Sequence, residues 1–516
     1  MKLKRSTLVA LALGLLASCG GGSEDDTTEY VVDDSTARGT LVRNPPERTA
    51  SWSGPHIADL LKALANGDSL LEAAGDPVCG IDFHRIEYQT VGAKDEPARV
   101  SGVLMVPTGE ASSCSGPRPI VVYAHGTSTE RSYNLAAVGD TDNPAWTEGL
   151  EVAAIFAAQG YIVVAPNYVG YDTSSLAYHP YLNADQQSKD MIDALSAARK
   201  ALGKVQASTT VDSGRLFVTG YSQGGHVAMA THRAMQTAGQ TVTASAPMSG
   251  PYALLAFLDS VVLGNVGLGS TEFMPLLTTS WQRTYGNLYT TPSEFYETQY
   301  ADGIESLLPN AQSFDDLVSA GKLPASALFS DQTPVTGDAS LDAALAKPSD
   351  PVFALGFGTP NLVRNSVRVA YGRDALADPD GARTSPQTAG VPMAANPTHP
   401  MRVAAKNNDL RNWTPQSPVL LCGGNADPTV PFSTNTLVMQ SYWSGLPSGR
   451  LTVLDIDTAV AGDSDPYAAP KRGFALVKDV LNRTGGETSV RDNYHVYVAP
   501  FCTAAARDFF DMQAQP

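Results

Sequence analysis

Short apolar runs alternate with helical stretches along much of the chain. The runs at 119–127 (PIVVYAHGT) and 161–168 (YIVVAPNY) are typical of strands that are buried on both faces. Residues 147–160 between them have helical apolar spacing and end on a glycine. Residues 183–203 predict a second helix, which Asn183 caps. This alternation predicts an α/β fold with a mostly parallel sheet flanked by helices.

The alternation resumes on both sides of one long interruption. We expect further buried strands from the apolar runs at 215–220, 241–250, 417–424 and 451–458. Residues 251–415 between them carry few strand signals, many Pro, Gly and Asp residues, and several helical stretches. We interpret this segment as a mainly helical cap over the carboxyl edge of the sheet, inserted between core parts 45–250 and 416–516. The alternative is an appended domain with no part in substrate access.

Two strands near the N-terminus predict a hairpin. Residues 81–91 and 98–107 have strand patterns, Cys79 precedes the first, and Cys114 follows the second. The open ends of a hairpin meet, so these two cysteines are expected to lie close together.

The cysteine count agrees with disulfide bonding. Apart from Cys19, the chain has four cysteines, an even number that suggests two disulfides with three possible pairings. The hairpin favours a Cys79–Cys114 bond and leaves Cys422–Cys502. No Cys-x-x-Cys motif or His/Cys cluster indicates a metal site.

The N-terminus predicts export. Residues 1–18 carry three cationic residues followed by an apolar run that is too short to span a bilayer, which is typical of a signal peptide. The run ends in Leu-Ala-Ser before Cys19, which resembles the lipobox of bacterial lipoproteins, so Cys19 is the expected site of lipidation. A plain signal peptide with an incidental cysteine is the alternative. Residues 19–44 are polar and acidic and predict a flexible tether.

Net charge excludes one class of partner. The formal charge of −17 becomes −20 if residues 1–18, with their three cations and no acids, are removed. Such an acidic surface repels phosphate backbones and anionic headgroups, which argues against nucleic-acid binding. Membrane contact is therefore expected only through the lipid anchor.

Residues 218–230 (VTGYSQGGHVAMA) contain a candidate nucleophile. Ser222 lies between Gly220 and Gly224 in a G-x-S-x-G pattern, after an apolar run and before a helical one. A serine held on a strained strand-to-helix turn needs neighbours without side chains, because the strand and the helix crowd together there. An ordinary buried turn serine is the alternative interpretation.

A serine hydroxyl needs a base, and the base needs an orienting acid. In this architecture the order is serine, acid, histidine, and Asp427 follows the predicted strand at 417–424. Asp455 and Asp457 are the other candidates, although they end the next strand. Of the eight histidines only His495 lies beyond Asp427, in a segment that we expect to be a loop before the terminal helix. A loop-capping aspartate and an exposed histidine are the alternatives.

Backbone amides are the expected oxyanion donors. One is the amide of Gln223, which follows the nucleophile. The other is assigned to Thr127, in the loop after the strand at 119–127, and its hydroxyl could also help. We interpret His125 and His226 as packing residues.

With these residues assigned, the chain resembles the secretory lipase family of α/β hydrolases, which contains fungal lipase A and bacterial relatives. The likeness covers about 85–250 and 417–510 and depends on several motifs, EYQTVGAKDEPARVSGVLMVP, YAHGT, GYIVVAPNYVGYD, YHPYLNADQQSKDMIDALSAARKAL, GYSQGG and GGNADPTVP. The resemblance implies an α/β-hydrolase fold, ester hydrolysis, a cap that governs an acyl pocket, and a triad of Ser222, Asp427 and His495.

The resulting hypothesis is a lipid-anchored serine carboxylesterase or lipase that acts on small-molecule or lipid esters without a cofactor. A serine peptidase of the same fold and a polyester depolymerase are the enzymatic alternatives. A surface binding lipoprotein with an inert pocket is the alternative from outside enzymes. The sequence predicts no oligomeric state.

Overall fold

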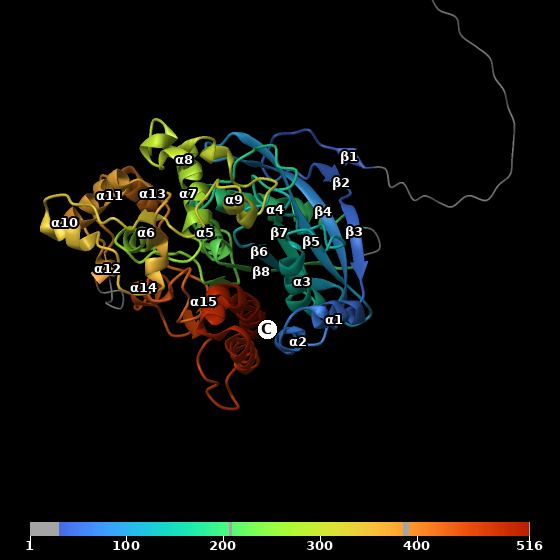
Figure 1. The fold of residues 1–516 in the computed structure, drawn as a ribbon. Helices are drawn as coiled ribbons and strands as arrows, with labels where there is room; N and C mark the ends of the chain where they lie inside the picture. The colour runs from blue at the N-terminus through green and yellow to red at the C-terminus, as the bar shows by residue number, and fades with distance from the viewer. Residues whose placement is uncertain (1–29, 206–208, 385–391, 515–516) are drawn as a thin grey trace, which may run out of the picture.

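The computed structural model describes residues 30–205, 209–384 and 392–514. Its centre is a nine-stranded sheet in the order β13-β12-β9-β8-β6-β7-β5-β4-β3 (Figure 1). The strands of this sheet are β3 (Glu47–Trp52), β4 (Gly80–Val91), β5 (Pro97–Thr108), β6 (Pro117–Ala124), β7 (Ile162–Pro166), β8 (Val211–Tyr221), β9 (Ala244–Met248), β12 (Val419–Gly423) and β13 (Leu451–Asp455).

Six neighbouring strands of the sheet, from β13 to β7, run parallel, and β5, β4 and β3 continue the sheet with antiparallel pairing. The central strands β6, β7, β8 and β9 are the continuous apolar runs of the sequence, because helices cover both of their faces. The predicted hairpin is β4 paired with β5. The prediction of a mostly parallel sheet is confirmed.

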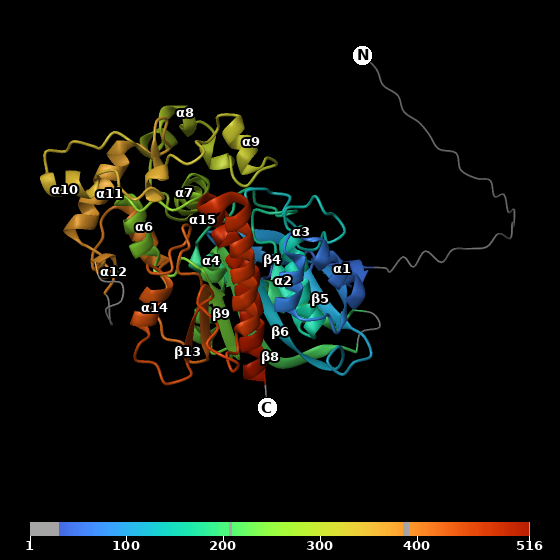
Figure 2. The ribbon, with the colours of Figure 1, turned by 60° about the horizontal axis from the view of Figure 1, so that its bottom comes forward.

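Helices cover the two faces of the sheet. On one face α4 (Ala184–Leu202) and α5 (Gln223–Thr237) pack together and contact the strands. Asn183 caps α4 as predicted, because its side chain accepts a hydrogen bond from the Gln186 amide at 3.1 Å. Helices on the other face contact one another, and Figure 2 shows the longest of them in front of the sheet. They are α2 (Gly67–Ala74), α3 (Trp146–Ile155) and α15 (Ala468–Ala514), with α1 (Gly54–Ala63) packed on α2 and α3.

Between β9 and β12 the chain leaves the sheet and forms a mainly helical segment with an apolar core of its own (Figure 1). Its helices are α6 (Leu254–Val262), α7 (Ser270–Tyr285), α8 (Thr298–Ala301), α9 (Phe314–Ser319), α10 (Ala339–Ala344), α11 (Asn365–Ala377), α12 (Gly381–Thr384) and α13 (Pro400–Asn407). A short parallel pair, β10 (Phe329–Ser330) with β11 (Phe357–Gly358), lies among them. The limits of the cap stay a prediction.

A buried ion pair anchors the first helix of this segment. Asp259 in α6 and Arg402 in α13 are fully buried and form two hydrogen bonds of 2.9 Å. Arg402 also bonds the Asp374 carboxylate at 2.9 Å. A buried charge requires such partners. The acidic residue that interrupts the apolar stretch of α6 is thus part of the packing of the segment.

The structure contains both expected disulfides, Cys79–Cys114 at the open end of the hairpin and Cys422–Cys502 between β12 and α15. Disulfides of this kind persist in oxidising compartments, which favours an exported protein. Cys19 and the predicted signal peptide lie outside the described residues. Within the described ranges, no helix combines the length and the apolar character that crossing a membrane would require.

One prediction for the N-terminal region is wrong in part. Residues 30–44 belong to the predicted flexible tether, but β1 (Val31–Val32) pairs with β2 (Arg43–Asn44), and Leu41 and Val42 are buried. Residues 41–42 lie beside β4, where the Val42 amide donates a hydrogen bond to the Glu87 carbonyl at 2.7 Å. These contacts order the second half of the segment despite its polar composition.

Candidate active site

Ser222 lies in the sharp turn between β8 and α5, with φ 58° and ψ −121°. Such a positive φ is strained for a residue with a side chain, and its amide fixes the turn by donating to the Met248 carbonyl of β9 at 3.0 Å. A Cβ atom at Gly220 would lie 2.4 Å from the Ala124 carbonyl oxygen, and one at Gly224 only 1.9 Å from it. The glycines are required for the predicted steric reason.

His495 lies in α15, and the prediction of a loop at this position is wrong. The helical segment before it ends at Gly486, where φ is 69° and ψ is −167°, and a new segment carries His495. Tyr494, Val498 and Phe501 recur at helical spacing and are buried. This packing outweighs the low helix propensity of the Asn, Tyr, His and Val residues around His495.

The structure brings the three predicted catalytic side chains together. His495 Nδ1 lies 2.6 Å from Asp427 Oδ2, and His495 Nε2 lies 2.9 Å from Ser222 Oγ. Asp427 is 5% exposed, and its other oxygen accepts the amides of Thr429 at 2.9 Å and Val430 at 3.0 Å. With Nδ1–H donating to the carboxylate, Nε2 is free to accept the serine proton.

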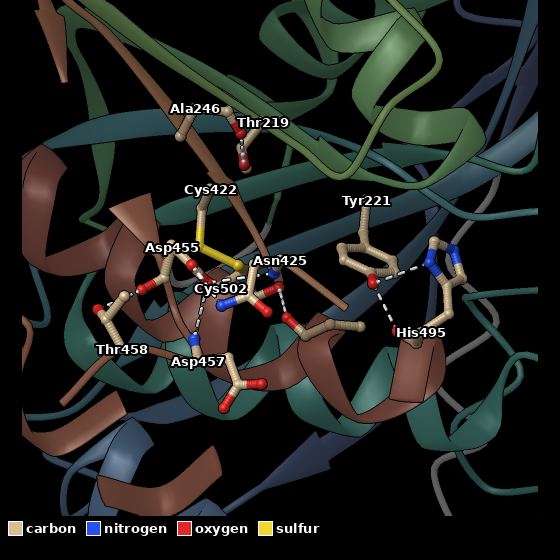
Figure 3. The surroundings of a disulfide bond; sticks show 12 residues. Thr219, Tyr221, Ala246, Cys422, Asn425, Asp455, Asp457, Thr458, His495 and Cys502 are labelled. Atoms are coloured by element: carbon tan, nitrogen blue, oxygen red, sulfur yellow. Dashed lines mark hydrogen bonds between the residues drawn. A yellow bond between two sulfur atoms is a disulfide. The ribbon is translucent and has the colours of Figure 1, made fainter. Parts of the chain in front are cut away.

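The two alternative acids hold the loop that carries Asp427. Asp455 accepts the Asn425 side chain at 2.7 Å and the Asn425 amide at 3.2 Å (Figure 3). Asp457 accepts the Tyr494 hydroxyl at 2.9 Å, and that hydroxyl accepts the Ala426 amide at 3.3 Å. Both carboxylates therefore support the loop between β12 and Asp427.

The two expected oxyanion donors flank Ser222. Thr127 lines the same cavity as Ser222 and follows β6, and Gln223 is the first residue of α5. In the part of the chain that the structure describes, neither backbone amide donates to another protein group. The Thr127 hydroxyl lies 3.1 Å from the Tyr181 hydroxyl. Both amides thus remain available for a developing negative charge.

Glu148 supports the Thr127 loop and is not predicted from the sequence. Its carboxylate accepts the Gly126 amide at 3.2 Å, the Tyr123 hydroxyl at 2.9 Å and the Tyr133 hydroxyl at 2.5 Å. The only available signal is an acidic residue within the apolar helix at 147–160. Its role depends on partners far away in the sequence.

Three other histidines, His125, His179 and His226, are buried near the site and contact the segments that form it. The Gln223 side chain donates to His179 Nε2 at 2.6 Å, and His179 Nδ1 donates to the Val169 carbonyl at 2.7 Å. His125 stacks between two tyrosine rings, and His226 contacts the Asn408 carbonyl at 2.9 Å. Burial lowers the pKa of His125 and of His226 to about 4, so both stay neutral. Their positions agree with a packing role.

A small apolar cavity of about 70 Å³ is lined in part by Ser222. Helices α6 and α7 of the inserted segment form much of its wall, through Leu254, Phe257, Leu258, Val261, Phe273, Met274 and Leu277. Ser222, Gln223 and Val430 also line it. The small volume and the apolar lining suit a hydrocarbon chain.

A larger cavity of about 600 Å³ meets Ser222 on the side of His495. Glu148, Glu151 and Glu272 line it, together with aromatic and small polar residues. Burial, with the nearby charge of Glu148, raises the pKa of Glu151 to about 8. Burial likewise raises the pKa of Glu272 to about 7. Within the described ranges, no group of three His, Cys, Asp or Glu side chains is arranged to hold a metal.

Comparison with known proteins supports a hydrolase. Residues 149–252 match the prolyl oligopeptidase family model. The ligand-bound structure of the rice cell wall degrading esterase LipA from Xanthomonas oryzae is 27% identical, covers 92% of this chain and 100% of its own, and has a TM-score of 0.66. Another LipA structure is 26% identical, covers 92% and 100%, and has a TM-score of 0.65.

A putative hydrolase from Legionella pneumophila is 18% identical, covers 91% of this chain and 97% of its own, and has a TM-score of 0.60, which shows the fold alone. A search of curated proteins gives no match. The chain has the α/β-hydrolase fold, as predicted, and is esterase-like in structure. The predicted resemblance to α/β hydrolases of the lipase and esterase type is confirmed.

Proposed function

We propose that the chain is a serine carboxylesterase or lipase that hydrolyses carboxylic esters through an acyl-enzyme intermediate. The observation that carries the proposal is the continuous contact from Asp427 through His495 to Ser222. Nucleophile, base and orienting acid lie within hydrogen-bonding distance, each from a different element. This geometry suits attack of a hydroxyl on a carbonyl carbon.

In the proposed reaction, Ser222 Oγ attacks the ester carbonyl while His495 Nε2 takes its proton. The Asp427 carboxylate stabilises the imidazolium, and the amides of Thr127 and Gln223 bind the negative oxygen of the tetrahedral intermediate. The imidazolium then protonates the departing alcohol. A water molecule, activated by the same imidazole, hydrolyses the acyl-enzyme and regenerates Ser222.

The two cavities suit different parts of the ester, the acyl chain and the alcohol. The apolar cavity along α6 and α7 suits the acyl chain, and its small volume favours short or slender chains. The larger cavity beside His495 suits the alcohol, because the imidazolium must reach the leaving oxygen. The similarity to an esterase that degrades plant cell walls supports an ester as the substrate class.

Ser222→Ala tests the proposal. Loss of the nucleophile is expected to lower kcat for p-nitrophenyl esters by at least about 10⁴-fold, because a triad acts as a unit. A fluorophosphonate probe should label the wild-type protein and not the variant. An unchanged unfolding midpoint serves as the control, and retained turnover in a folded Ser222→Ala protein would refute the assignment.

A serine peptidase of the same fold is the second candidate. The match of residues 149–252 to the prolyl oligopeptidase family and the acidic Glu272 in the larger cavity favour it, since a carboxylate can bind a peptide amine. Matched ester and arylamide substrates with the same acyl group separate the two functions. For an esterase, the ratio of kcat/KM for the ester to kcat/KM for the arylamide should greatly exceed the ratio of the uncatalysed hydrolysis rates of the two substrates. A peptidase should instead cleave peptide arylamides efficiently.

Lipid anchoring through Cys19 remains part of the proposal. Removal of residues 1–18 would leave Cys19 as the acylated first residue, followed by a polar segment. Incorporation of a labelled fatty acid in bacteria, and its loss in Cys19→Ser, would test the anchor independently of catalysis.

A further inference from the structure

Tyr221, which directly precedes the proposed nucleophile, contacts the proposed base. Its hydroxyl donates to the backbone carbonyl of His495 at 2.5 Å, and the same oxygen lies 3.3 Å from His495 Nδ1 (Figure 3). The two rings lie 4.9 Å apart at an angle of 41°. Tyr221 is 5% exposed and the His495 side chain is 14% exposed, and both line the larger cavity.

From this contact we propose that Tyr221 is a positioning residue that holds His495 between Ser222 and Asp427. The inference depends on the proposed ester hydrolysis. Strand β8 ends at Tyr221, and Ser222 follows directly. The end of this one strand therefore positions the nucleophile and, through the Tyr221 hydroxyl, the base. The distance between Ser222 Oγ and Nε2 is thereby set by two adjacent residues.

The phenol also affects charge at the imidazole. Burial, together with the nearby Asp427 carboxylate, raises the pKa of Tyr221 well above its usual range, so the phenol keeps its proton. Because that proton is donated to the His495 carbonyl, a lone pair of the phenol oxygen faces Nδ1–H. A partially negative oxygen at this distance stabilises the imidazolium that forms in the transition state. The benefit arises mainly in the chemical step.

Tyr221→Phe tests the inference, because it keeps the ring and removes only the hydroxyl. The expected result is a fall in kcat of about tenfold for an ester substrate, with KM changed less than about twofold, since the lost interaction strengthens in the transition state. The downfield proton signal of His495 Nδ1–H should also shift or broaden in the NMR spectrum of the variant.

Tyr161→Phe is the matched control. Tyr161 is also buried, and its hydroxyl bonds Asp511 of α15 at 2.5 Å, away from the site. This variant loses a partly buried hydrogen bond to the same helix, so it should affect stability but neither kcat nor the Nδ1 signal. Equal kcat values for Tyr221→Phe and wild type, or equal losses in both variants, would overturn the positioning role.

Two further experiments separate a failure of the proposed function from a failure of the role of Tyr221. If Ser222→Ala retains activity, the proposed function itself fails, whatever Tyr221→Phe does. If Tyr221→Phe does not fold, fluorinated tyrosines incorporated at position 221 replace it, because they keep the hydroxyl and make its oxygen a weaker acceptor. The value of kcat should then fall with increasing fluorination, and a flat series would overturn the stabilisation of the imidazolium by the phenol oxygen.

Discussion

Partly buried carboxyl groups in the cavity beside Ser222 differ in how their charge is compensated. Glu148 accepts three hydrogen bonds, whereas Glu151, one helical turn later, has no hydrogen bond among the described residues. Burial raises the pKa of Glu151 to about 8, compared with 4.5 for an ordinary glutamate. Its side chain is therefore protonated in the folded protein at neutral pH and ionised in the unfolded chain.

This difference predicts a pH-dependent stability. Below about pH 4.5 both states hold the proton, so Glu151 costs nothing. As the pH rises toward 8, only the unfolded chain releases the proton, and unfolding becomes more favourable. Glu151→Gln removes this cost and should raise the free energy of unfolding by about 1–2 kcal/mol near pH 8, after allowance for its partial exposure, and by much less near pH 5.

Denaturant titrations at the two pH values measure this effect. Glu110→Gln is the control, because Glu110 is exposed and has no partner among the described residues. A stabilisation by Glu151→Gln that is equal at both pH values would contradict the assigned cause.

Individual residues were predictable where chain order constrains them. The G-x-S-x-G pattern and the elimination of other histidines indicated Ser222 and His495, and a position shortly after a buried strand favoured Asp427 over Asp455 and Asp457. Glu148 and Tyr221 were missed, because each acts through a partner remote in sequence: Glu148 through the loop after β6, and Tyr221 through α15. No local pattern distinguishes such residues from ordinary core positions.

Among the elements, α15 depends on one backbone position. Gly486 adopts φ 69° and ψ −167°, a region that is almost restricted to glycine, and no non-neighbouring atom of the described residues lies within 4 Å of the place a Cβ would occupy. Gly486→Ala would therefore add backbone strain without a clash. The strain should lower the free energy of unfolding by about 1–3 kcal/mol. The variant should also lower kcat, because a change of the backbone angles at position 486 would change the direction of the helical segment that carries His495.

Gly445→Ala is the matched control for this variant. Gly445 also has open space around it but lacks a positive φ, so alanine there should be nearly neutral. Thermal unfolding and ester kinetics on the two variants separate strain from a general effect of removing glycine. Equal behaviour of the two variants would show that the break does not control the base.

The strands were more predictable than this helix. A strand buried on both faces needs a continuous apolar run, and β6, β7 and β12 show it directly. The segment around His495 lacks such a signal, since its helical form depends on packing of Tyr494, Val498 and Phe501 against the sheet. Tertiary contacts therefore determine the helical conformation of this segment.

On the scale of the molecule, the two disulfides differ in what they connect. Cys79–Cys114 closes a hairpin, whereas Cys422–Cys502 joins the strand before Asp427 to the helix that carries His495. Removing either pair by double alanine substitution should cost about 2–4 kcal/mol of stability. Only Cys422→Ala/Cys502→Ala should also lower kcat, because it loosens the acid relative to the base.

Unfolding titrations and ester kinetics on both double variants, without reductant, check this expectation. The Cys79→Ala/Cys114→Ala protein is the control, with a similar loss of stability and unchanged kcat. Unchanged kcat in both proteins would show that packing alone aligns Asp427 with His495.

The inserted segment marks the limit of prediction for the whole molecule. Its sequence indicated helices between two parts of the core, and helices α6 and α7 do line the cavity beside Ser222. Its internal packing was not predictable, because buried pairs such as Asp259 with Arg402 join residues that are far apart in the chain. Composition does not reveal such pairs.

The placement of the cross-links has a consequence for proteolysis. Each lies wholly on one side of residues 251–415. A single cut in that stretch would leave two fragments with no covalent connection, one holding Ser222 and the other holding Asp427 and His495. Noncovalent contacts alone, among them strand pairing between β9 and β12 and the packing of α15, would keep the nicked enzyme assembled. Limited digestion would thus turn the protein into a complementing pair of polypeptides, separable by denaturation even without reductant.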